Sequence, residues 1–275
     1  SSGTIWELSN SVAGTMIEGE KQWAYSTDNK VAGETEHIAI GMDGAYAHIR
    51  NDGYREAMCG TVSYYDREGK RLHTNYLGCS PEYCKEKFRD MMEKEIQNVK
   101  KRFPDALYIG VADGARDNWT FLGKHADKCI VDFYHATTYL ASFAEALPQG
   151  GKEWLEGACH RLKHTKGGAA TVLQEMKEKL PTIKRKQKKT EAKKAVTYFT
   201  NKEGMMDYAG HLEEGLPIGS GVTEAGCKRL VKQRFCQSGM RWSKEGMDKM
   251  LTARALYLSE GRWQEFWQYY GKAAA

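Results

Sequence analysis

Three acidic residues have neighbours that suit metal-dependent chemistry. Asp43 and Asp113 each follow an apolar run and precede a glycine, in GMDG and VADG. Glu224 comes later, in GSGVTEAG, where Gly-Ser-Gly predicts a turn and Ser220 a possible helix N-cap. Ligands of α/β proteins bind beyond strand ends, so acids at the ends of two neighbouring strands would converge. A divalent cation relieves the repulsion between converging carboxylates.

The expected metal is Mg²⁺ or Mn²⁺, because hard carboxylate oxygens without a nearby Cys or His pair suit these ions better than zinc. Sites that act on phosphodiesters commonly hold two ions about 4 Å apart. Two aspartates hold such a pair poorly, so a third acid is needed. We expect Asp43, Asp113 and Glu224 to be the metal ligands and catalytic residues.

Each acid also has a simpler explanation when it is taken alone. Asp-Gly is a common turn dipeptide, so Asp43 and Asp113 could each be turn residues. A glutamate in the first turn of a helix complements the helix dipole, which accounts for Glu224 without any metal. The combination of two Asp-Gly strand ends with a glutamate on a later basic helix favours the catalytic interpretation.

Cations follow Glu224 along the predicted helix, and further basic residues lie elsewhere in a chain of net charge +5. Such residues suit a phosphate backbone, although a solvated helix face explains a lysine run equally well. Trp242 suits either stacking on a base or packing in the core. The expected DNA-binding residues are Arg116, Lys184, Arg185, Lys186, Lys228, Arg229, Lys232, Arg234, Arg241 and Trp242.

His135 is a further catalytic candidate. It follows the apolar run KCIVDFYH, close to the end of a predicted strand at Asp132. There it could contact the scissile phosphate or shuttle a proton. Capping or packing of the following helix is an equally good explanation.

The elements that must position these residues are predicted from hydrophobic periodicity. Residues 1–36 are polar and are predicted to be irregular or to form short strands. A strand from residue 37 is expected to end at Asp43-Gly44. Residues 56–66 and 71–79 alternate as two strands around the turn Arg67–Lys70, which predicts a β-hairpin. Pro81 is expected to start a helix that runs to Arg102.

The second half of the chain is predicted to be mainly helical. Residues 106–113 and 128–132 are continuous apolar runs typical of buried strands, separated by a short helix near 118–125. Helical spacing dominates from His135 on, and the last helices are expected near 220–236, 245–260 and 262–270. This order predicts an α/β fold with a mixed sheet flanked by helices. The helical stretch from about 140 to 212 is too long for one small sheet, so we interpret it as an insertion.

The cysteine pattern and the hydropathy of the chain indicate its cellular compartment. The seven cysteines include no CxxC pair and no signal peptide is evident, which favours a reducing cytosol. No apolar run approaches the roughly 20 residues that a membrane-spanning helix needs, so no membrane partner is expected.

These features resemble a known family. The order of elements and the Asp, Asp and Glu set resemble the RNase H-like DDE transposases of bacterial insertion sequences, most closely the ISKra-type group. The resemblance covers roughly residues 37–265 and is carried by GMDGAY, VADGARDNW, DFYHATTYL and PIGSGVTEAGCKRLVKQRFCQSGMRWS. The last stretch is the most specific, with its Gly-Ser-Gly-x-x-Glu start, its basic helix and its Gly-Met-Arg-Trp end.

The resemblance implies a fold, a site and a reaction. It implies an RNase H-like catalytic domain over 37–140 and 213–270, an N-terminal extension over 1–36 and an all-helical insertion over 141–212. It implies that Asp43, Asp113 and Glu224 bind the metal. Such enzymes cleave one DNA strand at a transposon end and use the freed 3′-OH to attack target DNA. Double-stranded DNA, a homo-oligomer assembled on it and a prokaryotic cytoplasm with its nucleoid are therefore the expected partners and location.

Two other classes of protein remain open. A nuclease of the same fold, such as a junction resolvase, would cleave DNA without strand transfer. A domesticated protein would bind DNA without catalysis, and substitution of Asp43 would leave its function intact.

Overall fold

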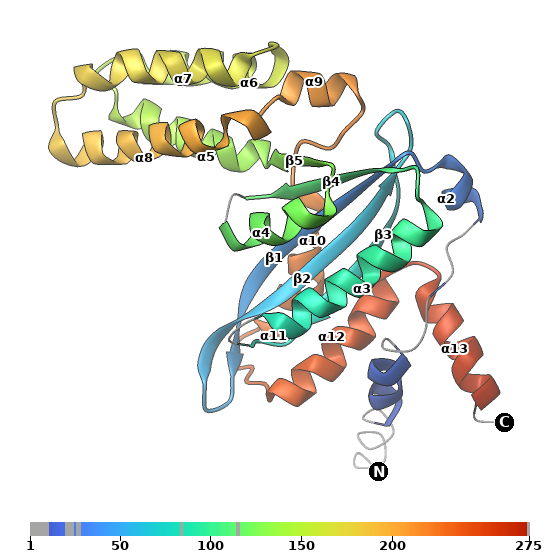
Figure 1. The fold of residues 1–275 in the computed structure, drawn as a ribbon. Helices are drawn as coiled ribbons and strands as arrows, with labels where there is room; N and C mark the ends of the chain where they lie inside the picture. Colours follow the sequence, from blue (N-terminus) through green and yellow to red (C-terminus); the bar gives the residue numbers. More distant parts are fainter. Residues whose placement is uncertain (1–10, 20–24, 26–28, 83–84, 114–115, 274–275) are drawn as a thin grey trace. The chain divides into compact units, whose positions relative to one another are not determined.

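The computed structural model describes residues 11–19, 25, 29–82, 85–113 and 116–273, and it divides into two compact units (Figure 1). Unit 1 is formed by the chain up to Tyr108 and from Gly221 on, and unit 2 is formed by Ile109–Ser220. The strands make a mixed five-stranded sheet in the order β3-β2-β1-β4-β5. The predicted mixed α/β architecture is therefore confirmed.

Unit 1 contains the antiparallel part of this sheet. Its strands are β1 (His37–Ile49), β2 (Gly53–Tyr65) and β3 (Arg71–Cys79). β1 pairs with β2 over its whole length, and β2 pairs with β3. The predicted hairpin around Arg67–Lys70 is confirmed, because β2 ends at Tyr65 and β3 begins at Arg71.

The helix after the hairpin begins later than predicted. α3 spans Glu86–Arg102, so the prediction that Pro81 starts the helix is wrong, whereas the predicted end at Arg102 is confirmed. Glu82 explains the difference, because its carboxylate accepts hydrogen bonds from the backbone N–H groups of Lys87 and Phe88. The residues before Glu86 thus supply a cap for the helix rather than its first turn.

One face of the unit 1 sheet is covered by the C-terminal helices. These are α10 (Gly221–Cys227), the π-helical turn η3 (Lys228–Lys232), α11 (Gln233–Phe235) and α12 (Lys244–Leu258). Alternate β1 residues, Ala45, Ala47 and Ile49, are buried in one apolar cluster with Leu230, Val231 and Phe235 of this helical segment. Alternate residues of β1 and the apolar side of this helical segment thus pack together and hold the segment on the strand.

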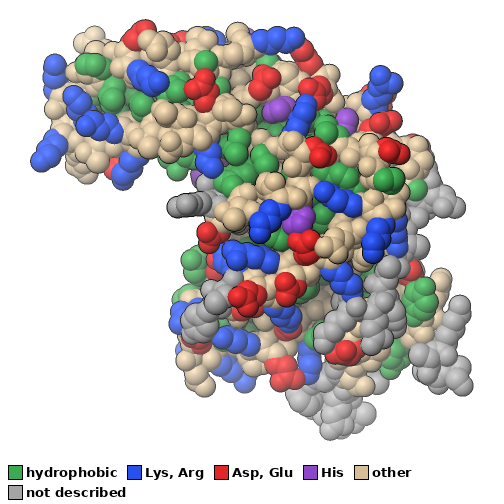
Figure 2. All heavy atoms as spheres, in the orientation of Figure 1, with side chains coloured by type: hydrophobic (Ala, Val, Ile, Leu, Met, Phe, Trp, Pro, Cys, Tyr) green, Lys and Arg blue, Asp and Glu red, His purple; other side chains and the backbone are tan. Residues whose placement is uncertain are grey.

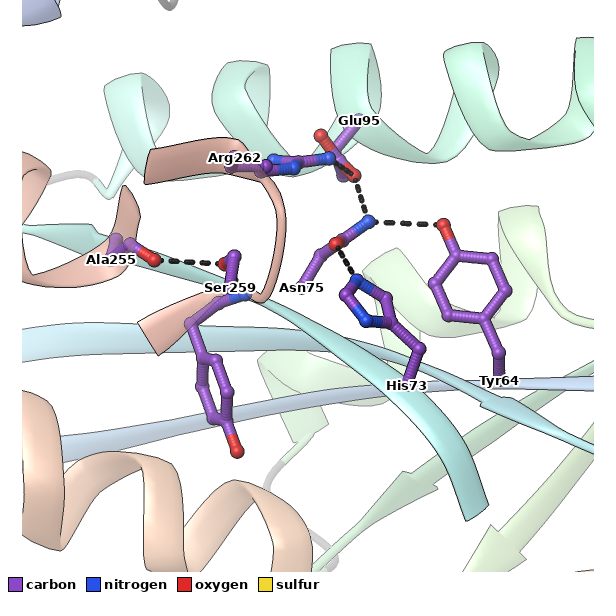
Figure 3. A network of polar contacts seen from close by, with 8 residues as sticks. Tyr64, His73, Asn75, Glu95, Ala255, Ser259 and Arg262 are labelled. Carbon is purple, nitrogen blue, oxygen red and sulfur yellow. Dashed lines mark hydrogen bonds and ion pairs between the residues drawn. The ribbon is translucent and has the colours of Figure 1, made fainter. Parts of the chain in front are cut away.

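A buried polar network lies between β3, α3 and α13 (Arg262–Ala273), as Figure 3 shows. Glu95 of α3 pairs with Arg262, and both side chains are about nine-tenths buried. Asn75 donates to Glu95 at 2.8 Å and to the Tyr64 hydroxyl at 3.0 Å, and it bonds to His73 at 2.7 Å. Burial raises the pKa of Tyr64, which therefore keeps its proton. The network satisfies these buried polar groups, as a packed interior requires.

Unit 2 combines the parallel strands with a helical stretch. β4 (Leu107–Ala112) and β5 (Lys128–Val131) pair in parallel and flank α4 (Arg116–His125). The helical elements that follow are α5 (Phe133–Ala146), α6 (Gly151–His164), α7 (Gly168–Lys179), α8 (Lys186–Lys202) and α9 (Tyr208–Glu213). The predicted helical character of this stretch is confirmed, and the domain boundaries at 141 and 212 stay a prediction.

The described part of the N-terminal segment is helical rather than irregular or extended. Residues 11–19 and α2 (Asn29–Glu34) are helices, so the prediction for 1–36 is wrong over these residues. Met16 is buried in an apolar cluster with Leu256 and Phe266, with Val12 packed against it. Val12 and Met16 are four residues apart and therefore lie on one face of the helix. The segment has few apolar residues, so its helical periodicity is weak in the sequence. Among the helices described here, none has the length and apolar character needed to cross a membrane.

Candidate functional site

Asp43 lies within a strand and not at its end. It pairs with Cys59 of β2, and β1 continues for six further residues to Ile49, so the prediction of a strand end at Asp43-Gly44 is wrong. Gly44 serves packing rather than a turn, because a Cβ there would lie 2.3 Å from Glu56 Oε1. The half-buried Asp43 carboxylate accepts a hydrogen bond of 2.7 Å from the Gly44 N–H.

Helix α10 approaches the sheet closely at two glycines. A Cβ on Gly41 would lie 1.9 Å from Thr223 Oγ1, and one on Gly226 would lie 3.0 Å from Cys59 Sγ. The hydroxyls of Thr61 and Thr223 form a buried hydrogen bond of 2.7 Å at this contact. Because Gly41 and Asp43 are two residues apart on a strand, they face the same side of the sheet, toward α10.

Cys227 links Asp43 to the helix that carries Glu224. A hydrogen bond with Cys59 raises the pKa of the buried Cys227 thiol, and burial and the neighbouring Asp43 carboxylate raise it further. Cys227 therefore stays a neutral thiol that interacts with Asp43. Glu224 is exposed and lies three residues before the buried Cys227 in the same helix. Asp43 and the Glu224 helix are thus brought together within unit 1.

The helix that carries Glu224 continues through a π-helical turn, Lys228–Lys232. Such turns displace the regular backbone bonds and are frequent at functional sites. Arg254 of α12 supplies donors at this turn: its guanidinium bonds to the carbonyl of Arg229 and, at 3.2 Å through Nε, to the carbonyl of Leu230. Arg254 therefore holds the π-helical turn in place from the neighbouring helix.

Most of the predicted DNA-binding residues of unit 1 reach solvent. Lys228, Arg229, Lys232 and Arg241 are exposed. The half-buried Arg234 lies over the ring of Trp242, with its Cζ 5.0 Å from the ring centroid. Trp242 is tied to β1 through its backbone, which bonds to His48 and Arg50, and its ring packs edge-on against Phe235. Trp242 thus packs against the core cluster and stacks with a cation.

The basic run of unit 2 occupies the junction of α7 and α8. Lys184, Arg185 and Lys186 are exposed there. Figure 2 shows Lys and Arg side chains gathered at the end of unit 2 where α7 leads into α8. Arg116 is the first residue of α4, and its side chain lies outside the described residues.

Asp113 follows the last residue of β4, as predicted, and is half-buried. Its backbone carbonyl accepts a hydrogen bond of 3.0 Å from the hydroxyl of Tyr198 on α8. Nothing in the sequence around Tyr198 indicates this contact, because it joins residues 85 positions apart.

Asp132 is an acid whose role the sequence analysis missed. It is 1% exposed and forms the N-cap of α5, where its carboxylate accepts from the His135 backbone N–H. It also accepts from the backbone N–H of Ser220 and, at 3.0 Å, from the Ser220 hydroxyl. An Asp immediately before a helix is an N-cap signal that could have been recognised. Asp132 therefore ties the end of β5 to the segment that precedes α10.

His135 lies in the first turn of α5 beside two tyrosines. Its ring centroid is 5.6 Å from that of Tyr139 and 6.1 Å from that of Tyr198. Its backbone N–H bonds to Asp132, so the capping and packing explanation accounts for this position. The catalytic role of His135 stays a prediction.

The predicted metal ligands fit Mg²⁺ in type, since all three are carboxylates. Over the described ranges, no group of three or more His, Cys, Asp or Glu side chains is gathered as a metal site. Asp43 and Glu224 belong to unit 1 and Asp113 to unit 2. A metal centre formed by all three therefore stays a prediction.

The comparison with known families places the chain in one of them. The fold is that of a mixed α/β protein with carboxylates on β1, after β4 and on α10. Residues 70–268 match the model of an uncharacterised protein family, UPF0236, and the chain belongs to that family. The matched region contains Asp113 and Glu224. No curated protein matches the chain.

Proposed function

We propose that this chain is the RNase H-like catalytic portion of a DDE transposase, which cleaves and transfers DNA strands in a metal-dependent reaction. The observation that supports this most is the close packing of α10, which carries Glu224, on β1, which carries Asp43. Glycine and threonine contacts hold that helix against the strand. Two predicted ligands from opposite ends of the sequence thus belong to one packed strand and helix.

Asp43, Asp113 and Glu224 are the residues that would hold the metal. Bound Mg²⁺ or Mn²⁺ ions, two in the usual arrangement, supply the charge that activates a water or a 3′-OH and stabilises the leaving oxygen. The half-buried position of Asp43 limits its freedom, which favours a fixed ligand geometry.

Double-stranded DNA is the proposed substrate, as transposon end and as target. The exposed Lys228, Arg229 and Lys232 follow Glu224 on one continuous helical segment. Cations at such positions bind phosphates and orient the duplex without reading its sequence. The basic α7–α8 junction of unit 2 is proposed to contact the transposon end or its flank, in a homo-oligomer on DNA.

A strand-transfer assay tests this function. The purified chain is mixed with Mn²⁺, a supercoiled plasmid and pre-cleaved 3′-OH oligonucleotides taken from the DNA that flanks its coding region. We expect joining of the oligonucleotide to the plasmid. Asp43→Asn, Asp113→Asn and Glu224→Gln should each reduce joining about a hundredfold or more, because each removes several kcal/mol of transition-state stabilisation.

Glu178→Gln is the matched control, since Glu178 is an exposed acid of α7 that bonds to Gln174. It should join DNA at the wild-type rate. Nicking of the plasmid without joining would favour a nuclease of the same fold instead. DNA binding that survives Asp43→Asn, with no cleavage by the wild type, would favour a non-catalytic protein.

A further inference from the structure

Tyr198 of α8 contacts the backbone of Asp113. Its hydroxyl donates to the Asp113 carbonyl oxygen at 3.0 Å. We propose that Tyr198 is a positioning residue that holds the backbone of Asp113 in place, so that its carboxylate extends from a fixed position for metal binding. The proposal rests on the proposed function, since it takes Asp113 as a metal ligand.

The hydrogen bond between Tyr198 and Asp113 lies just beyond the end of β4, where it can restrain the backbone. β4 ends at Ala112, whose carbonyl still accepts from the N–H of Asp132 at 2.9 Å. Asp113 is the next residue, beyond the strand ladder, and Tyr198 provides a donor for its carbonyl. A hydrogen bond to this carbonyl restrains the peptide plane that follows Asp113, and thereby restrains the residue that carries the carboxylate.

The ring of Tyr198 is itself held in place. It stacks on Tyr139 of α5 with the ring centroids 3.8 Å apart and an interplanar angle of 12°. A phenol is protonated at neutral pH, so the Tyr198 hydroxyl is the donor of this hydrogen bond.

A second contact of α8 reaches the helix that follows Asp113. Lys202 lies one helical turn after Tyr198, and its Nζ is 5.1 Å from the ring centroid of the buried Trp119 on α4. Residues four apart share one face of a helix, so Tyr198 and Lys202 act from the same side of α8. This face of α8 thus contacts the chain both at Asp113 and beyond it.

Mn²⁺ titration of the full chain by calorimetry tests the proposal with Tyr198→Phe, which retains the ring and removes the donor. Tyr139→Phe is the matched control, because it leaves the Asp113 carbonyl its donor. Asp113→Asn identifies the binding that depends on Asp113. We expect Tyr198→Phe to weaken this Mn²⁺ binding about tenfold, as loss of a residue that orients a ligand commonly does. Tyr139→Phe should bind as the wild type does.

Hydrogen exchange of the Asp132 amide gives a readout without metal. The amide closes the last rung of the β4–β5 ladder, so it should exchange faster in Tyr198→Phe than in Tyr139→Phe. Wild-type Mn²⁺ affinity in Tyr198→Phe, while Asp113→Asn weakens binding, would overturn the positioning role and leave the proposed function standing. If the wild type binds no Mn²⁺, or Asp113→Asn changes nothing, the proposed function fails. In that case the exchange rate of the Asp132 amide alone tests the role of Tyr198. Equal exchange rates in Tyr198→Phe and Tyr139→Phe would overturn its positioning role.

Discussion

Asp43 and Asp113 are predicted to perform similar chemistry, but the protein holds them in different ways. Asp43 sits within a strand paired along its whole length, and a helix packs against it through glycines. Asp113 follows the end of a short strand, where Tyr198 bonds to its backbone and Asp132 fastens the next strand end. The position of Asp43 therefore depends on backbone pairing and close packing, whereas that of Asp113 depends on polar side chains from distant segments.

The largest expected effect is on the unit 2 side of this comparison. Asp132→Ala removes the α5 cap and leaves donors of Ser220 and His135 without their acceptor. Loss of a cap and of buried charged hydrogen bonds should lower the free energy of unfolding by about 3 kcal/mol, measured by denaturant titration. The acid at position 132 is almost completely buried, so water cannot replace it.

Asp207→Ala is the control for this change. Asp207 is the exposed N-cap of α9 in the same unit, where it accepts from the Gly210 N–H at 3.3 Å. Its loss should cost about 1 kcal/mol or less. Equal losses of stability in Asp132→Ala and Asp207→Ala would mean that the hydrogen bonds from Ser220 to Asp132 add no stability. Asp132 would then act only as a helix cap, like Asp207.

The next effect is on the unit 1 side and tests the close packing beside Asp43. Gly41→Ala places a Cβ against Thr223 and should lower the free energy of unfolding by about 2 kcal/mol through overpacking. The double variant Gly41→Ala/Thr223→Ala removes the clashing oxygen. It should therefore lose less stability than the two single variants together, which a double-mutant cycle measures. Strict additivity would contradict a direct contact between Gly41 and Thr223.

The smallest expected effect concerns Arg254 and the π-helical turn. Arg254→Lys retains the charge but loses the guanidinium that reaches two carbonyls, so it should cost about 1 kcal/mol. The turn carries Lys228, Arg229 and Lys232, and we expect DNA affinity to fall with it. Fluorescence anisotropy with a labelled duplex at several salt concentrations measures this loss. Unchanged stability and affinity in Arg254→Lys would show that the turn needs no support from α12.

Sequence patterns predicted the parts of this molecule that depend on local periodicity. The β2–β3 hairpin, the α3 end at Arg102 and the strand that precedes Asp113 all followed from residue spacing. The Asp-Gly pair at Asp43 gave a wrong strand end, because pairing with β2 continues past it and Gly44 makes room for Glu56. A turn propensity is a local preference, and long antiparallel pairing overrides it.

The side chains that support the candidate site could not be predicted from local periodicity. Tyr198 and Arg254 act on backbone carbonyls far away in the chain, and no spacing rule links such residues. Asp132 is different, because the sequence could have predicted its role as an N-cap. Its hydrogen bonds with Ser220 could not be predicted. The cations after Glu224 were predicted as a row, and the π-helical turn that interrupts their regular spacing was not.

The structure of the full chain with Mn²⁺ tests the central claim most directly. We predict that carboxylate oxygens of Asp43, Asp113 and Glu224 bind the metal, at about the 2.1 Å found in octahedral oxygen sites. Carboxylates more than about 8 Å apart, with no metal between them, would contradict a shared two-metal centre and the proposed catalytic role of all three residues.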